Sequence, residues 1–286
     1  MCSIAGWIAD QPLDPLTARK LSAALLWYGA PRGDQSCGIW LDGRHYRAAL
    51  PPKQAIYTPE FLETVGSGGT MCLLHTRQPT SGGRDATDAQ PFVIDNTVSI
   101  HNGMISNCEE LKKQFELEKV GTQVDSALVT AFVHKHGPQR LPDFIKAIRG
   151  SAAIAVIHDG AMWAMRDTNP LEYQILCFGD GAKITLFAST EHQLRDSMAH
   201  LWMLEPAMRT ITSTMRQLFR VTPEGLTAVG APVPFATSYG GWHRDDEDMF
   251  GGRSANGRRD RRRYQGGSTT QQGTGGSPGG KVVEPR

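Results

Sequence analysis

A cysteine stands second in the chain and is followed by a short, mostly apolar run, residues 3–8. If Met1 is cleaved, Cys2 carries a thiol and a free α-amine on one residue, and the amine can take the thiol proton directly or through one water molecule. An α-amine titrates near pH ~8 and a free thiol near ~8.5, so both groups react close to neutral pH. The terminus therefore predicts a nucleophile with its own base, although position alone would favour a small buried side chain.

Further along the chain, several segments combine side chains that could bind or activate a substrate. They are residues 31–38, 75–82, 88–92, 101–107 and 122–126. Taken singly, each has a structural interpretation: a solvated strand end, an Asn-Gly turn, or a carboxylate in the first turn of a helix. Together, and downstream of Cys2, they indicate one functional site.

The elements that must position these segments follow from hydrophobic periodicity and turn signals. Strands are expected at residues 4–9, 71–76, 92–94, 97–101, 152–158, 161–166, 173–178, 183–188, 215–222 and 226–229. Helices are expected at residues 16–28, 107–117, 124–136 and 142–148, the second of them with Asn107 as its cap. Hairpins in two sets with helices between them predict an α+β fold, in which helical layers sandwich two antiparallel sheets.

Bulk properties narrow the function classes. The chain has 286 residues and a formal net charge of +1, which gives no general attraction to nucleic acid or a membrane surface. Neither a signal peptide nor an apolar stretch of ~20 residues is present, which favours a cytoplasmic protein without a membrane partner. Its cysteines are odd in number and scattered, which argues against a disulfide framework or a structural zinc site. They are Cys2, Cys37, Cys72, Cys108 and Cys177.

The composition changes near residue 240. Residues 1–240 alternate apolar runs with turns and are expected to form one folded domain. Residues 241–286 form a Gly/Arg-rich tail that cannot bury enough apolar surface to offset its ordering entropy, so we expect it to be disordered. The basic run 258–263 could contact nucleic acid, but a solvated tail is the preferred interpretation.

In their order after the N-terminal cysteine, the motifs resemble the glutaminase domain of class II glutamine amidotransferases. That family opens Met-Cys-Gly-Ile and continues with Arg-Gly-x-Asp-Ser-x-Gly, His-Thr-Arg-x-x-Thr-x-Gly, Asn-Ala-x-Pro, His-Asn-Gly-x-Ile-x-Asn and a Thr-Asp-Ser-like segment. The resemblance extends from Cys2 to about Ser189. It implies the four-layer αββα sandwich of N-terminal-nucleophile hydrolases, and no metal or organic cofactor for the half-reaction.

The resemblance also implies roles for individual residues. Cys2 would attack the γ-amide carbon of glutamine, and the Asn102 side chain with the Gly103 backbone N–H would form the oxyanion hole. Arg77 would bind the substrate α-carboxylate and Asp125 its α-ammonium. Four further residues would line or support this pocket: Thr80 and Ser81 beside the substrate, and Arg32 and His101 behind the reacting groups.

Three positions depart from the family pattern. Ser3 replaces a glycine, Gln35 stands where an aspartate is usual, with Asp34 one residue early, and Ala127 replaces a glutamate. Only about 50 residues follow the expected sandwich, too few and too polar for an acceptor-binding domain. The expected function is therefore glutamine hydrolysis through a Cys2 thioester, with ammonia passed to a separate synthase.

Two alternatives stay open. One is an amidohydrolase of the same fold acting on another γ-glutamyl compound or amide. The other is a weakened, non-catalytic scaffold, for which the missing acid at position 35 is the main support.

Overall fold

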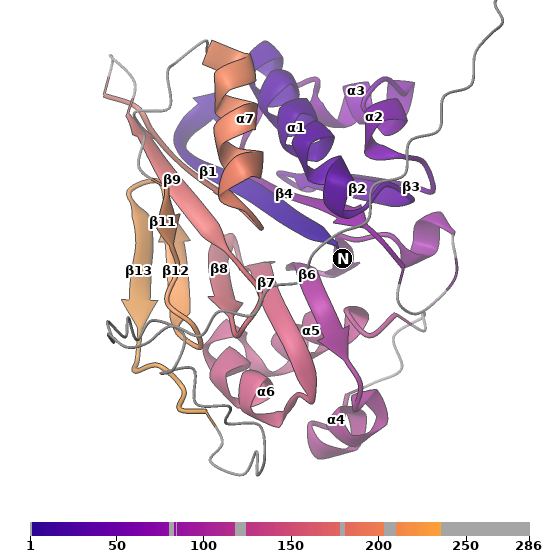
Figure 1. The fold of residues 1–286 in the computed structure, drawn as a ribbon, viewed down its shortest axis with the longest axis vertical. Helices are drawn as coiled ribbons and strands as arrows, with labels where there is room; N and C mark the ends of the chain where they lie inside the picture. The colour runs from indigo at the N-terminus through magenta and orange to yellow at the C-terminus, as the bar shows by residue number, and fades with distance from the viewer. Residues whose placement is uncertain are drawn as a thin grey trace, which may run out of the picture. The chain divides into compact units, whose positions relative to one another are not determined.

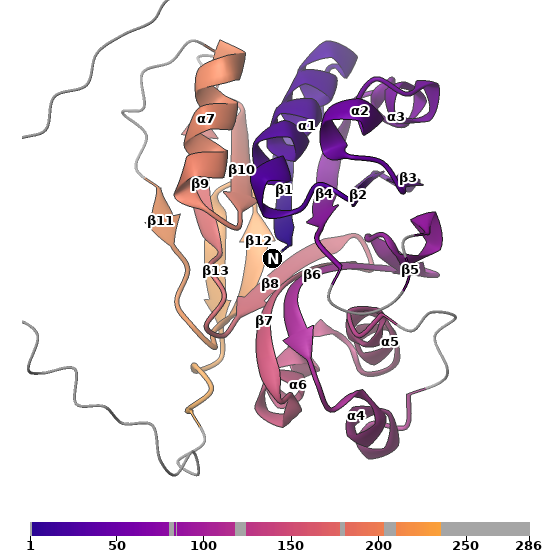
Figure 2. The same cartoon turned by 45° about the vertical axis from the view of Figure 1, so that its right-hand side comes forward.

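The structure is a computed structural model that describes residues 2–79, 83, 85–117, 124–177, 181–202 and 210–235, all within one compact unit, Met1–Thr237. Two sheets lie face to face between helices (Figures 1 and 2). The tail beyond residue 240 and its boundary lie outside the described residues. The strands of the first sheet are, in spatial order, β11 (Ile211–Thr212), β9 (Glu172–Cys177), β10 (Lys183–Ala188), β1 (Ser3–Leu13), β4 (Gly69–Arg77), β2 (Ser36–Leu41) and β3 (Arg44–Ala48).

The second sheet has six strands, and neighbouring strands pair antiparallel in both sheets. Its spatial order is β13 (Gly225–Val229), β12 (Leu218–Thr222), β8 (Ala161–Arg166), β7 (Gly150–His158), β6 (Thr97–Ile105) and β5 (Phe92–Ile94). The expected α+β fold with two antiparallel sheets is thus confirmed.

Helices cover the outer face of each sheet (Figure 2). The first sheet carries α1 (Pro15–Gly29), α2 (Pro52–Ala55), α3 (Pro59–Val65) and α7 (Glu191–Trp202). The second carries α4 (Cys108–Gln114), α5 (Ala127–His136) and α6 (Leu141–Ala147). Single 3₁₀ turns occupy Ala30–Arg32, Ala86–Asp88 and Pro138–Arg140. The order of layers is therefore helix, sheet, sheet, helix.

Strand alternation explains why three separate apolar layers form, because successive side chains of a strand point to opposite faces. In β1, Trp7 packs under the helices while Ile4 packs between the sheets. In β4, Leu74 packs under the helices and Leu73 between the sheets. Strands buried on both faces read as nearly continuous apolar runs, as β2 does with all six residues buried.

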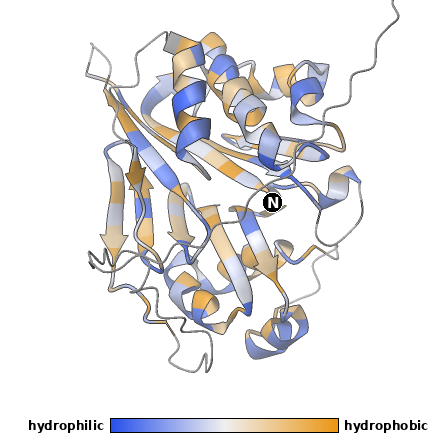
Figure 3. Cartoon of the chain, in the orientation of Figure 1, coloured by the Kyte–Doolittle hydropathy of each residue, from blue (hydrophilic) through white to orange (hydrophobic). Residues whose placement is uncertain are grey.

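The helices are amphipathic or short, and their ends follow local signals. Asp14 caps α1 by accepting hydrogen bonds from Leu16 N (2.9 Å) and Thr17 N (3.1 Å), and Pro15 occupies the first turn. Only Leu111 is buried in α4, which is correspondingly hydrophilic in Figure 3. Of the helices in the described parts of the chain, none is both long and apolar enough to cross a bilayer.

Several sequence expectations differ from the structure. The hairpin β2–β3, helices α2, α3 and α7, and the short strand β11 were not predicted, although Asp42-Gly43 is a hairpin signal with positive φ at both residues. Strand 215–222 begins only at Leu218. Asn107 precedes α4 without capping it, because its side chain instead accepts from Arg149 N (2.8 Å) and donates to Ala147 O (2.9 Å).

Candidate active site

Cys2 lies immediately before the first residue of β1 and is half-buried. Its thiol lies 3.4 Å from both the carbonyl oxygen and the backbone nitrogen of Gln78, which follows β4. The Arg32 guanidinium donates to the Cys2 carbonyl oxygen over 3.0 Å. Two chain segments therefore contact the cysteine: the 3₁₀ turn that contains Arg32 and the residue that follows β4.

Burial raises the pKa of the Cys2 thiol, and the hydrogen bond from Gln78 N opposes this only in part. The thiol is thus protonated at neutral pH and cannot attack as a thiolate without transferring its proton. The α-amine that Cys2 gains when Met1 is removed is a base of suitable strength on the same residue.

Asn102 and Gly103 lie on β6, which packs across the sheet interface against β1 and β4. Because Ile100 points between the sheets, regular alternation directs Asn102 to the same space, and the start of β1 lies beside β6 in both views (Figures 1 and 2). Asn102 is only 2 % exposed, and its Nδ2 has no hydrogen-bond partner among the residues that the structure describes. A buried, unpaired amide donor is costly unless a ligand completes it.

Gly103 cannot be replaced by a larger residue without rearrangement. A Cβ at this position would clash with the Ser151 carbonyl oxygen and would lie 2.7 Å from His101 Nε2. Its φ of +155° adds to this restriction. The Asn-Gly pair is therefore a strand segment of close backbone approach, not a turn.

Arg77 ends β4 on the face that points between the sheets and is 3 % exposed. Its Nη1 donates to the Gly83 carbonyl oxygen over 2.8 Å, and Gly83 N in turn donates to the Asp88 carboxylate. These contacts tie the guanidinium to the chain that follows β4. Thr80 and Ser81, predicted beside the substrate, lie outside the described residues.

Asp125 precedes α5 and is 8 % exposed. Its carboxylate accepts from Ile105 N at the end of β6 (2.7 Å) and from Ser126 N (2.9 Å). It lies close enough to Cys2 to act on the thiol electrostatically, as the positive Arg77 does with the opposite sign. Charges of both signs therefore act on the Cys2 thiol, with Arg77 lowering its pKa and Asp125 raising it.

His101, expected behind the reacting groups, belongs to a buried polar network with Gln90, Ser126 and His75, whose contacts the sequence did not indicate. Gln90 accepts from His101 N (2.6 Å), and its Nε2 lies 3.0 Å from His101 O, 3.1 Å from Ser126 Oγ and 3.2 Å from His75 Nε2. His101 Nδ1 lies 2.8 Å from Ser126 Oγ. Burial lowers the pKa of His75 to about 3, with further lowering from His101 and Arg77, and burial also lowers the pKa of His101. Both imidazoles are thus neutral near pH 7 and act as hydrogen-bonding supports.

Two departures from the family pattern have a structural explanation. Ala127 is fully buried in a small apolar cluster with Phe92 and Val124, where a glutamate would be an unpaired buried charge. Ser3 is 1 % exposed and donates to Gln193 Oε1 over 2.6 Å. The third departure has no structural explanation in the described parts of the chain, where Asp34 is exposed and the Gln35 Oε1 atom is buried without a partner.

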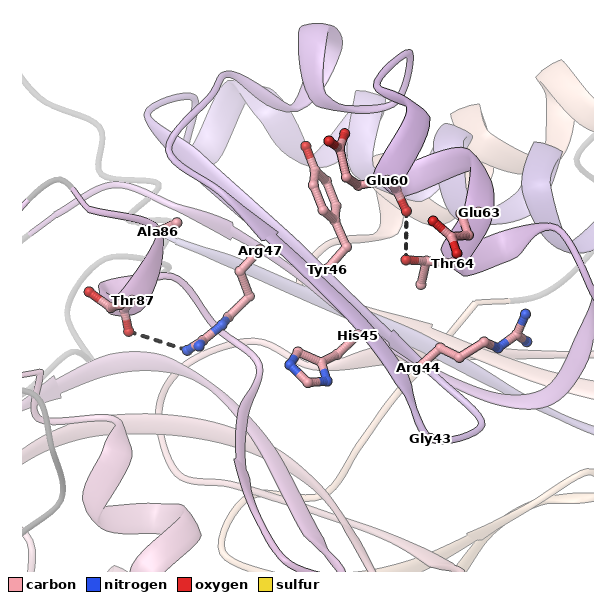
Figure 4. Close-up of a pocket in the computed structure, with 10 residues that line it drawn as sticks. All are labelled: Gly43, Arg44, His45, Tyr46, Arg47, Glu60, Glu63, Thr64, Ala86 and Thr87. Carbon is pink, nitrogen blue, oxygen red and sulfur yellow. Dashed lines mark hydrogen bonds between the residues drawn. The ribbon is translucent and has the colours of Figure 1, made fainter.

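Of two cavities in the described structure, only one contains a predicted site residue. One, of about 450 Å³, is lined by Arg77, Gln35 and Pro79, with Asp34, Ser36, Ala49 and Pro51. The other, of about 620 Å³, lies over β3 and α3 (Figure 4), and none of the predicted site residues that the structure describes lines it. The first cavity therefore adjoins the candidate site, and the second does not. Within the described ranges, no three His, Cys, Asp or Glu side chains cluster closely enough to hold a metal ion.

Comparison with known proteins places these features in a family context. Residues 75–196 match the model of the glutamine amidotransferase domain. The chain is 31 % identical over 191 residues to a glutamine–fructose-6-phosphate aminotransferase (isomerizing) of Gluconobacter oxydans, covering 60 % of this chain and 29 % of that protein. It is 28 % identical over 198 residues to an amidophosphoribosyltransferase of Pasteurella multocida, covering 62 % and 38 %.

The fold is similar to that of a solved glutamine phosphoribosylpyrophosphate amidotransferase from B. subtilis, with a TM-score of 0.60 and 17 % identity. That similarity covers 80 % of this chain and 49 % of the solved one. The chain thus spans less than half the length of each of these relatives, and the structural likeness concerns the fold.

Proposed function

Because the chain carries a class II glutamine amidotransferase domain, we propose that it hydrolyses the γ-amide of glutamine to glutamate and ammonia through a γ-glutamyl thioester on Cys2. The observation that carries this proposal is the Asn102 amide nitrogen, which is buried without a partner among the described residues, on the strand β6 that packs against β1, the strand that follows Cys2. A fixed donor in a dry site stabilises the negative oxygen of a tetrahedral intermediate far more than water does.

The proposed reaction has two steps. The Cys2 sulfur attacks the γ-carbonyl carbon while its proton passes to the α-amine, and the carbonyl oxygen becomes an oxyanion held by Asn102 Nδ2 and Gly103 N–H. The C–N bond then breaks, and ammonia leaves with the proton that the amine returns. Water attacks the thioester in the second step, the C–S bond breaks, and glutamate and the thiol are regenerated.

Glutamine is recognised in this proposal by the two charges of its amino-acid end. The Arg77 guanidinium binds the α-carboxylate, since its planar fork suits two parallel hydrogen bonds. The Asp125 carboxylate, already ordered by Ile105 N and Ser126 N, binds the α-ammonium. An amide without these charges would leave both groups unpaired and would bind poorly.

The ammonia acceptor is proposed to be a separate protein of the cytoplasm. The named relatives are a fructose-6-phosphate aminotransferase and an amidophosphoribosyltransferase, and the matched part is 29 % and 38 % of their length. We therefore propose that the ammonia is used outside the part of this chain that matches those relatives.

The test is glutamate release by the purified chain with Cys2 at its terminus, confirmed by intact mass. We expect glutamine-dependent glutamate and ammonia in equal amounts, and neither product from Cys2→Ala. Trapping with a glutamine-like electrophile should add one adduct at Cys2. A correctly processed chain that forms no glutamate and no adduct, with or without candidate synthases, would favour the non-catalytic scaffold.

Arg77→Lys is expected to raise KM for glutamine by about tenfold to a hundredfold with little change in kcat, because a lysine keeps the charge but loses the second hydrogen bond. Steady-state kinetics of glutamate release measure this. Arg47→Lys is the matched control, since the Arg47 guanidinium also donates to nearby carbonyl oxygens, those of Thr87 and Ala89, but lines the other cavity (Figure 4). An unchanged KM in Arg77→Lys would instead support a substrate without an amino-acid carboxylate.

A further inference from the structure

Ser3 occupies the first paired position of β1, opposite Thr76 of β4. Its side chain points to the helical side of the sheet, as the alternation with Ile4 requires. A serine hydroxyl buried there needs a partner. It has one in Gln193 of α7, whose Oε1 accepts from Ser3 Oγ over 2.6 Å, although 190 residues separate the two.

Gln193 is itself 2 % exposed, and both the oxygen and the nitrogen of its side-chain amide form hydrogen bonds. Its Nε2 donates to the Leu25 carbonyl oxygen of α1 over 2.8 Å. Gly29 leaves the space that this amide fills, because a Cβ at that position would lie 2.7 Å from Gln193 Nε2. One side chain thus joins β1, α1 and α7 at the point where β1 begins.

Cys2 lies one residue beyond this junction and outside the strand pairing. In the form that has Cys2 at its terminus, the reactive residue is restrained only by the residues that follow it and by its contacts. Among the described residues, its contacts include the Arg32 bond to its carbonyl oxygen and the Gln78 contacts of its sulfur. Strand ends fray unless side chains hold them, and the adjacent Ser3 is the residue that the helical layer holds.

We propose that Ser3 and Gln193 form a positioning pair. The pair fixes the start of β1 and thereby keeps the Cys2 thiol directed into the space between the two sheets. The proposal rests on the proposed function for its kinetic consequence, but the positioning itself can be measured without glutamine. The proposal also gives Ser3 a role. The family has a glycine at this position, and the serine that replaces it supplies the hydroxyl that donates to Gln193.

The variants that test the pair are Ser3→Ala, Gln193→Met and the double variant, each prepared with Cys2 at the terminus. The first readout is the pH dependence of Cys2 alkylation by iodoacetamide, followed by mass spectrometry of the N-terminal peptide. Release of the thiol from its buried place should lower its apparent pKa toward ~8.5 and speed alkylation at pH 7.5. The second readout is glutamate release, where kcat should fall by about tenfold to a hundredfold with KM unchanged.

Ser197→Ala is the matched control, because Ser197 is a fully buried serine of the same helix whose hydroxyl donates to the Gln193 backbone oxygen over 2.6 Å and touches no residue of β1 by hydrogen bond. It should lower the melting temperature without moving the alkylation profile. The double variant should be no worse than either single one, because the pair acts as a unit.

Three results would overturn the pair: wild-type alkylation profiles in both single variants, additive effects in the double variant, or changes that Ser197→Ala reproduces. If the wild-type chain releases no glutamate, the proposed function fails, yet the alkylation profiles still decide whether the pair positions Cys2. The two failures are therefore distinguishable.

Discussion

A chain whose Cys2 nitrogen is acylated is expected to release glutamate at least about a hundredfold more slowly than the same chain with a free terminal Cys2, because general-base assistance of this kind contributes ~10²-fold or more. Burial keeps the thiol protonated at neutral pH, so the proton must leave during attack. An amide nitrogen cannot accept it. A tag that a protease removes directly before Cys2 provides both states of one preparation, with intact mass as the check.

The pH dependence of glutamate release tests whether the α-amine is the base. The free amine accepts a proton only in its neutral form, so the rate should rise as pH increases through the ordinary α-amine range near ~8. A tag that leaves one glycine before Cys2 supplies a free amine one residue away from the sulfur, and this form should stay slow. Full activity in the acylated or the glycine-extended form would show that another group is the base.

The fold follows from the sequence where a local turn signal joins two apolar runs. Hairpins such as β7–β8, with Asp159-Gly160 between two apolar runs, are local in sequence and were predicted correctly. The β2–β3 hairpin was missed although Asp42-Gly43 marks its turn, since β2 is buried on both faces and β3 carries two arginines, so neither strand alternates clearly. Helix α7 was missed because its segment is polar on average.

Some residues of the candidate site can also be recognised from local sequence, and others cannot. Cys2, Arg77, Asn102 and Asp125 belong to compact motifs, and short segments can be recognised one at a time. The roles of Gln90 and Gln193 cannot be recognised in this way, because they depend on partners that only the fold brings close. Gln90 contacts His101, Ser126 and His75. Gln193 contacts Ser3 and Leu25. A single sequence contains no signal that pairs residues 3 and 193. Long-range polar contacts of buried residues are therefore the part that only the structure supplies.

Asn102→Leu is expected to lower kcat for glutamine hydrolysis by about a hundredfold to a thousandfold while KM changes little, since the oxyanion that Asn102 would hold exists only near the transition state. The same change should not reduce stability, and should raise it slightly, because it removes a buried donor that has no partner in the described structure. Kinetics of glutamate release and thermal unfolding measure the two effects separately.

Asn107→Leu is the matched control for this experiment. Asn107 is also buried, but its side chain is paired at both ends, with Arg149 N and Ala147 O. Its replacement should therefore destabilise the protein by about 1–3 kcal/mol and leave kcat unchanged. A loss of stability in Asn102→Leu with kcat preserved would mean that this amide serves the fold and that the oxyanion is held elsewhere. The opposite pattern, activity lost and stability kept, is the expected mark of a donor held unpaired for a substrate.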